Sequence, residues 1–173
     1  KTFFGKFTSN YFDVVTMWDV LEHIPNPEQF IKEIYKILKK GGKLVLTTPN
    51  SESFSLSILK KDWPEIQPPE HISFMNMGSL DILLRDYNYV TISCSSRYYL
   101  SPPIGFYSLI RKFLGKPKPS IKSIKESEKF RKNEKLPVYA RFIYWWYYKL
   151  SKLASIPFNL AKKGDSLLVV ATK

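Results

Sequence analysis

Three side chains of this sequence are spaced so that they could bind a cation or move a proton. Asp19, Glu22 and His23 stand at positions i, i+3 and i+4, so a helical turn would place all three on one face. Two oxygen ligands and an imidazole could hold a divalent ion, and the His23 ring could instead take up a proton near neutral pH. A purely structural role, in which Glu22 and His23 brace the loop before Pro25, stays open.

A second histidine follows a stretch that cannot remain helical. His71 comes after residues 62–69, which contain Pro64, Pro68 and Pro69. Such a segment can form a lid over a site. His71 could therefore contact a substrate, or its ring could anchor the loop by hydrogen bonds.

The elements that would position these residues can be predicted from periodicity and capping signals. Residues 12–18 form a continuous apolar and β-branched run, which predicts a strand buried on both faces. Residues 27–39 are predicted to be a helix, with Asn26 as N-cap and Gln29 as its capping-box partner. We expect Gly41 and Gly42 to end that helix before a strand at 43–48. The apolar face of the helix comprises Phe30, Ile34, Ile37 and Leu38.

The remaining elements of the sheet follow the same logic. We expect a helix over 79–87, capped by Asn76, and strands over 89–95 and 166–172. The side chains that should bury this helix are Leu80, Leu83, Leu84 and Tyr87. Together these elements predict an α/β fold.

The sequence resembles a known family in four places. The first and longest reads DVVTMWDVLEHIPNPEQFIKEIYKILKKGGKLVLTTPN, followed by PEHISF, the predicted helix and strand over 79–95, and GDSLLVVAT. These segments are similar to class I S-adenosylmethionine-dependent methyltransferases, in the branch of ubiquinone-biosynthesis O-methyltransferases and bacterial glycan-cluster methyltransferases. The likeness covers residues 3–96 and 164–173.

The resemblance implies the second half of a Rossmann-like methyltransferase sheet. In that family the last strand runs antiparallel between its two predecessors. The family's glycine-rich loop has no counterpart, since none of the seven glycines stands in a GxG spacing. We therefore expect that loop upstream of Lys1, and expect this chain to be the C-terminal part of a longer, truncated enzyme. Such a piece should be inactive alone.

Residues 97–163 form an insertion between residues 1–96 and 164–173, which make up the methyltransferase part. The net charge of +12 is concentrated here, interleaved with aromatic residues. Three interpretations stay open: a helical cap, an interfacial segment at 137–160 that contacts lipid, and a non-specific attraction to nucleic acid. No recognised nucleic-acid motif is present. The longest uncharged run, 142–148, is far shorter than the roughly 20 residues that span a bilayer.

The functional expectation is methyl transfer from S-adenosylmethionine to an oxygen of a small, glycan or lipid-linked acceptor. The resemblance places the backbone of Met17, Trp18 and Asp19 at the methionine side of the cofactor, although Trp18 could equally be a packing residue. His23 and His71 are the candidate catalytic bases. The resemblance also associates an acidic-x-x-Glu-His group, here Asp19, Glu22 and His23, with magnesium. Candidates for the acceptor wall are Glu22, Trp63, Glu70, Phe74 and Tyr99.

The alternative is a non-catalytic methyltransferase-like module that binds a lipid surface or a protein partner. The lone Cys94, expected to be a small buried residue, permits no internal disulfide, so a reducing cytoplasm is the expected location, with peripheral membrane contact through 137–160. The open edge of the strand at 12–18 predicts self-association of the piece.

Overall fold

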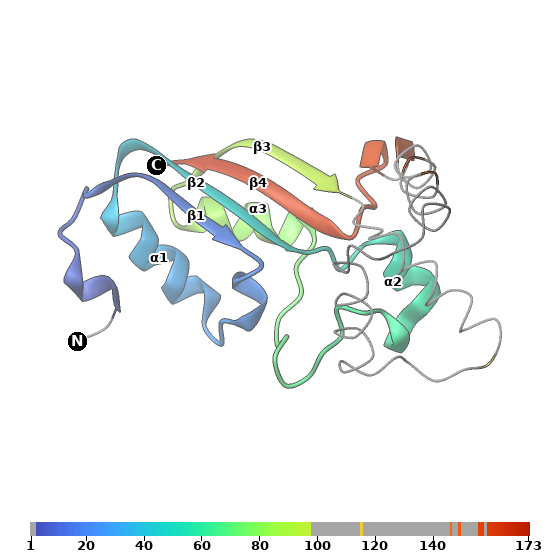
Figure 1. The fold of residues 1–173 in the computed structure, drawn as a ribbon. Coiled ribbons are helices and arrows are strands. Elements are labelled where there is room, and N and C mark those ends of the chain that lie inside the picture. Colours follow the sequence, from blue (N-terminus) through green and yellow to red (C-terminus); the bar gives the residue numbers. More distant parts are fainter. Residues whose placement is uncertain (1–2, 98–114, 116–145, 147–148, 150–155, 158) are drawn as a thin grey trace, which may run out of the picture.

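The structure, a computed structural model, describes residues 3–97, 115, 146, 149, 156–157 and 159–173. The described part is a mixed sheet with helices packed against it (Figure 1). Its strands are β1 (Phe12–Trp18), β2 (Leu38–Pro49), β3 (Val90–Arg97) and β4 (Ser166–Thr172). Its helices are α1 (Pro27–Ile37), α2 (Phe54–Leu59) and α3 (Met77–Asp86), with short 3-10 turns η1 (Phe3–Lys6), η2 (Leu21–His23) and η3 (Lys60–Asp62).

The sheet has the strand order β1-β2-β4-β3. β1 and β2 are parallel, and β4 runs antiparallel to both of its neighbours, β2 and β3. The predicted insertion of the last strand between its predecessors is therefore confirmed. Because β4 enters from the opposite direction, its first residue, Ser166, pairs with the last residues of β2 and β3, Pro49 and Arg97.

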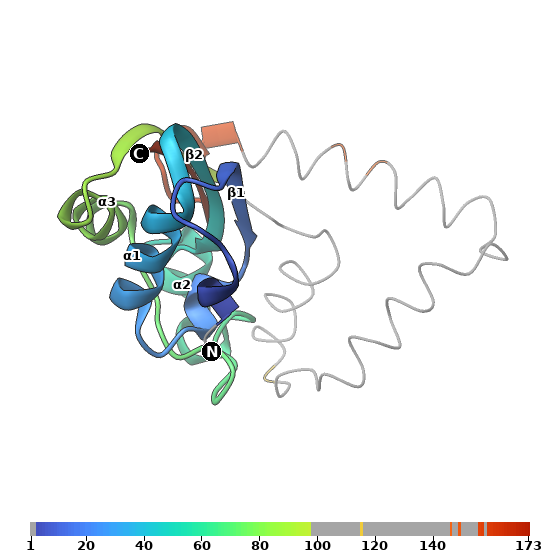
Figure 2. The ribbon, with the colours of Figure 1, turned by 90° about the vertical axis from the view of Figure 1, so that its left-hand side faces the viewer.

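The core lies on one face of the sheet, where α1 and α3 pack side by side (Figure 2). Leu44 and Leu46 of β2 and Val169 of β4 point to this face and are fully enclosed. Ile34 and Leu84 meet them from the two helices. Alternate strand residues supply this layer, as expected for a pleated sheet covered by helices.

β1 is not buried on both faces, so that prediction is wrong. Met17 lies in the core, but Val14 and Trp18, on the opposite face, are 50% and 57% exposed. Among the described residues no helix covers that face, and β1 has β2 as its only neighbour. The continuous apolar run therefore marks a strand whose second face is left open in the described part of the chain.

The junction between α1 and β2 also differs from the prediction. The helix ends at Ile37 rather than at residue 39, and β2 begins at Leu38 rather than at residue 43. Gly41 and Gly42 lie inside the strand, at an irregularity where the pairing jumps from Phe12↔Leu38 to Val14↔Lys43. Gly41 has a φ of +73°, and a Cβ on Gly42 would stand 2.8 Å from a backbone oxygen. The glycines shape a bulge rather than end the helix.

The helix caps agree closely with the sequence. Asn26 accepts a hydrogen bond from the Gln29 N–H at 3.0 Å, but the Gln29 side chain donates to Glu33 and forms no capping box. Asn76 caps α3 through Ser79 in a complete capping box. Both helices thus begin at or within two residues of the predicted position, and α3 buries its Leu80, Leu83 and Leu84, with Tyr87 only half-buried.

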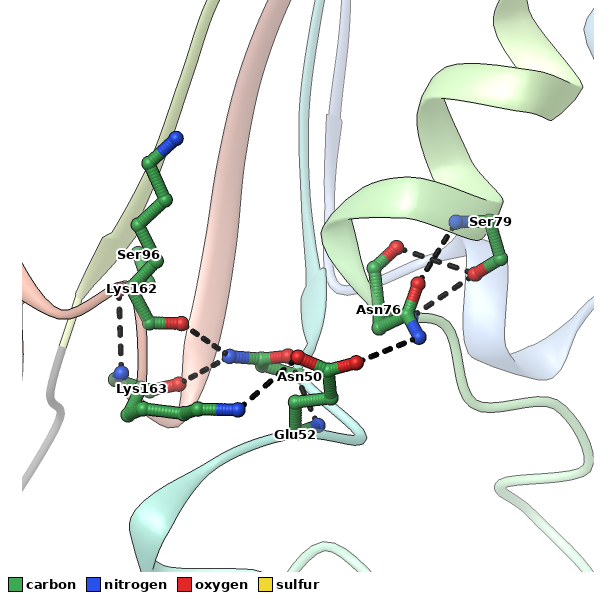
Figure 3. A network of polar contacts seen from close by, with 8 residues as sticks. Asn50, Glu52, Asn76, Ser79, Ser96, Lys162 and Lys163 are labelled. Carbon is green, nitrogen blue, oxygen red and sulfur yellow. Dashed lines mark hydrogen bonds and ion pairs between the residues drawn. The ribbon is translucent and has the colours of Figure 1, made fainter.

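Asn50 connects the end of β2 to the start of β4. Its buried side chain donates from Nδ2 to the carbonyl of Gly164 at 2.8 Å and accepts at Oδ1 from the Glu52 N–H at 3.0 Å. The Glu52 carboxylate pairs with Lys163 at 3.1 Å and accepts from Asn76 at 3.0 Å (Figure 3). This network fixes the residues just before β4 against the loop after β2.

Most of the insertion at 97–163, and with it Tyr99, lies outside the described residues. Trp146 and Lys149 belong to a helix and are exposed. No helix within the described residues is long and apolar enough to cross a membrane.

Candidate active site

The candidate site lies at the edge of the sheet where β1, β2 and β3 end. In open α/β sheets, ligands bind at the carboxyl ends of the strands. The chain leaves β1 through Asp19, which has a φ of +51°, and then turns through η2. The loop after β2 and the segment 63–74 approach the same edge.

Asp19 is held against β2 rather than on the face of the turn. Its N–H donates to the carbonyl of Thr47 at 3.2 Å, and the Thr47 hydroxyl donates to Asp19 Oδ1 at 2.9 Å. η2 is a 3-10 turn that begins at Leu21, two residues after Asp19. The predicted single face of Asp19, Glu22 and His23 therefore does not form, because the helical spacing does not extend back to Asp19.

Glu22 is the buried carboxylate of the site, with a relative exposure of 1%. Its Oε2 accepts a hydrogen bond from the Thr48 hydroxyl at 3.1 Å, while Oε1 has no partner among the described residues. The carbonyl of Glu22 accepts from the N–H groups of Ile72 and Ser73 at 2.9 and 3.2 Å. A buried carboxylate oxygen without a hydrogen-bond donor is costly, so this oxygen is available to a bound ligand.

Segment 63–74 packs over η2. Trp63 anchors it, since its ring is 2% exposed and lies 5.8 Å from the ring of Phe74. Ser73 Oγ donates to the carbonyl of Leu21 at 3.3 Å. The segment thus covers the η2 turn. Of the residues expected to form an acceptor wall, Trp63 is buried and Phe74 is 36% exposed.

The two histidine rings meet at 4.6 Å between centroids, in an edge-to-face arrangement. His23 Nδ1 lies 2.8 Å from the carbonyl of Glu70, and His71 Nδ1 lies 2.6 Å from the carbonyl of Glu65. A carbonyl can only accept, so each Nδ1 carries a proton, and the neutral form of each ring has its free lone pair on Nε2. Glu70 therefore contributes through its backbone, and His71 is anchored by the bond that would also fix its tautomer.

Carboxylates around the histidines make this edge of the sheet acidic. Burial raises the pKa of Glu65, His71 opposes this rise, and the charges of Asp19, Asp165 and Glu22 add to it. Burial also raises the pKa of Asp165, against hydrogen bonds from Ser55, Ser53 and Trp63. Its Oδ1 is buried with no hydrogen-bond partner among the described residues. The acidic character of this edge contrasts with the strongly basic composition of the whole chain.

A group of possible metal ligands lies here, but it differs from the one that the resemblance implied. One ligand atom each from Glu22, His23 and His71 lie within 4.8 Å of one another. Asp19 is not in the group. The oxygen-rich set that suits magnesium is therefore not assembled, and two imidazoles with one carboxylate stand in its place.

The sequence located part of this site. Met17 has its side chain in the core, and Trp18 is largely exposed, so packing inside the core is not its role. Cys94 is half-buried rather than enclosed. Thr47, Thr48, Glu65 and Asp165 were missed, although the two threonines at the end of a predicted strand were a readable signal. Nothing in the sequence brings Asp165 to Glu65, because they lie far apart along the chain.

Comparison with known proteins identifies the fold and the family. The described architecture is that of the Rossmann-like methyltransferases. Over 99% of its length the chain is similar to a SAM-dependent methyltransferase from Archaeoglobus fulgidus, with a TM-score of 0.54 and 15% identity, covering 63% of that protein. A SAM-dependent methyltransferase from Thermotoga maritima gives a TM-score of 0.55 at 18% identity, covering 96% of this chain and 58% of that one.

Residues 3–93 match the model of the methyltransferase domain family. The chain belongs to that family. Among curated relatives, the ubiquinone biosynthesis O-methyltransferase of Maricaulis maris (strain MCS10) is 37% identical over 54 residues, which are 30% of this chain and 21% of that protein. The match thus spans about a fifth of the length of this relative.

Proposed function

We propose that this chain forms the acceptor side, and part of the cofactor wall, of an S-adenosylmethionine-dependent methyltransferase. The observation that carries the proposal is the meeting of His23, His71 and the buried Glu22 at the carboxyl edge of a methyltransferase-type sheet. Family membership supports the reaction, and the position of the site supports its use, because this edge is where such sheets bind ligands.

The cofactor wall in this chain is the backbone at the end of β1. Met17, Trp18 and Asp19 lie there, and the hydrogen bonds of Asp19 to Thr47 hold the turn in one conformation. Trp18 is exposed next to this turn and is available to contact a ligand. A rigid turn suits methyl transfer, since an in-line displacement depends on the placement of the reacting atoms.

The acceptor is proposed to be a hydroxyl of a small, glycan or lipid-linked molecule. Transfer of a methyl group to a hydroxyl releases a proton, and an imidazole with a free lone pair can accept it. His23 is exposed and His71 half-buried, so the pair spans the boundary between solvent and interior. Glu70 and Phe74 lie on the segment that would cover the acceptor, and the surface-accessible face of Phe74 is available to pack on it.

Calorimetry with S-adenosylmethionine tests the proposal. The 173-residue chain should bind the cofactor weakly, because the family's glycine-rich loop is absent from it. A longer protein that includes such a loop should bind it tightly and transfer its methyl group to an oxygen acceptor. Tight binding by the 173-residue chain would contradict the expectation that part of the cofactor site is missing from this chain. Absence of binding by the longer protein would contradict the enzyme and favour a non-catalytic module.

A further inference from the structure

Three potential metal ligands converge from two separate segments. Glu22 and His23 lie on η2, and His71 lies on the segment that covers it. One ligand atom of each is within 4.8 Å of the others. The backbone bonds from Ile72 and Ser73 to the carbonyl of Glu22 hold the two segments together, so the convergence belongs to the fold.

The three side chains are prepared as acceptors of a cation. The carbonyls of Glu70 and Glu65 take the Nδ1 protons of His23 and His71, leaving Nε2 of each ring as an unprotonated nitrogen. Metal-bound histidines commonly show this arrangement, in which the other ring nitrogen donates to a carbonyl. Glu22 Oε1 is buried without a donor. A cation would satisfy all three atoms together.

We propose that Glu22, His23 and His71 bind one transition-metal ion of the zinc type, with His71 as a ligand and Asp19 excluded. Two imidazoles and one carboxylate favour zinc and its neighbours over magnesium, which prefers oxygen ligands and octahedral geometry. Asp19 Oδ1 already accepts a hydrogen bond from the Thr47 hydroxyl at 2.9 Å.

The geometry suits a site with open positions. Ligands about 2.1 Å from a tetrahedral zinc ion lie about 3.4 Å apart, so ligand atoms that lie within 4.8 Å of one another need a contraction of up to about 1.4 Å. Three protein ligands with a further open position are typical of catalytic zinc rather than structural zinc. His23 is exposed, so the open position faces solvent.

The consequence for catalysis rests on the proposed function. A bound ion would orient the acceptor oxygen and lower the pKa of its hydroxyl, and the two histidines would then act through the metal. Ion binding itself can be measured without cofactor or acceptor. Its failure would therefore leave the proposal of methyl transfer standing.

The test is titration of the untagged 173-residue chain with Co²⁺, read by visible absorption, followed by competition with Zn²⁺ and Mg²⁺. The chain contains only two histidines, so their ring signals in NMR spectra report directly on His23 and His71. We expect one Co²⁺ per chain, displaced by Zn²⁺ and not by Mg²⁺, with both ring signals broadened. Glu22→Gln, His23→Gln and His71→Gln should each weaken binding more than about tenfold. Asp19→Asn should not.

The choice of variants also separates a loss of metal binding from a loss of folding. His71→Gln removes the anchor to Glu65, so its fold is checked by circular dichroism, and the exposed His23→Gln serves as the second ligand variant. Equal weakening by Asp19→Asn and His71→Gln, or displacement of Co²⁺ by Mg²⁺, would overturn the proposal. Unchanged Co²⁺ affinity in a folded His23→Gln variant would overturn it as well.

Discussion

At the scale of single residues, the site depends on two imidazoles whose tautomers are set by backbone carbonyls. In a longer protein that includes the glycine-rich loop, replacing His23 or His71 with Gln should lower turnover by a factor of about 10² to 10⁴, because no imidazole then accepts the proton of the acceptor hydroxyl. The affinity for S-adenosylmethionine should stay nearly unchanged. Turnover and cofactor calorimetry on the same samples measure both.

The matched control for the histidines is Lys61→Gln. Lys61 is exposed and lies outside segment 63–74, so its side chain can change without disturbing either ring. Its turnover should stay near that of the wild type. If the histidine variants lost thermal stability and turnover together, the rings would be anchors of segment 63–74 and not participants in the reaction.

Glu65 predicts a pH dependence of stability. Its pKa is raised above 4.5 in the folded state, chiefly by burial, so the folded chain holds this proton more tightly than the unfolded chain. The contribution of Glu65 to stability therefore falls as the pH rises from about 4.5 through the raised pKa. Glu65→Gln removes that dependence. The variant should have the larger free energy of unfolding at pH 7, and the difference should shrink toward zero near about pH 4.

Urea unfolding in metal-free buffer at both pH values measures this difference. Glu70→Gln, an exposed change on the same segment, should show no comparable pH dependence. A difference of equal size at pH 4 and pH 7 would mean that the buried charge is not its cause.

At the scale of elements, the loops after β2 and before β4 form one connected unit. Asn50→Ala would leave the buried carbonyl of Gly164 and the Glu52 N–H without their partners and should cost about 2 to 3 kcal/mol. Asn26→Ala removes an exposed cap from α1, outside this network, and should cost about 1 kcal/mol. Urea unfolding of both variants gives the comparison. A smaller loss for Asn50→Ala than for Asn26→Ala would show that the network is not what fixes the start of β4.

Local signals explain which elements were predictable. The Asn26 and Asn76 caps depend on contacts within three residues, so the sequence contains them in full. The bulge at Gly41 and Gly42 depends on how β2 pairs with β1, which no local pattern records. For the same reason, no local pattern could show that His71, rather than Asp19, lies beside Glu22 and His23. A spacing of i, i+3, i+4 grouped Asp19 with Glu22 and His23, whereas the fold brings His71 beside Glu22 and His23 from a segment far along the chain.

At the scale of the whole molecule, the described part is a sheet with one covered face and two edge strands, β1 and β3. β1 pairs with β2 alone, and along its outer edge the backbone N–H and carbonyl groups of a seven-residue strand lack a neighbouring strand among the described residues. Val14 and Trp18 add exposed apolar surface beside that edge. Unprotected edges of this kind pair with other chains.

The 173-residue chain should therefore self-associate through β1. A charge on the strand opposes such pairing, so Val14→Lys should reduce the apparent mass in light scattering across a concentration series. Ile82→Lys is the matched control, since Ile82 is 62% exposed on α3, away from the edge. The apparent mass of the Ile82→Lys variant should change with concentration as that of the wild type does. A contact at the β1 edge should be weakened by a lysine on β1 and not by a lysine on α3. A monodisperse monomer at high concentration, or equal effects of the two lysines, would therefore show that the β1 edge is not the contact.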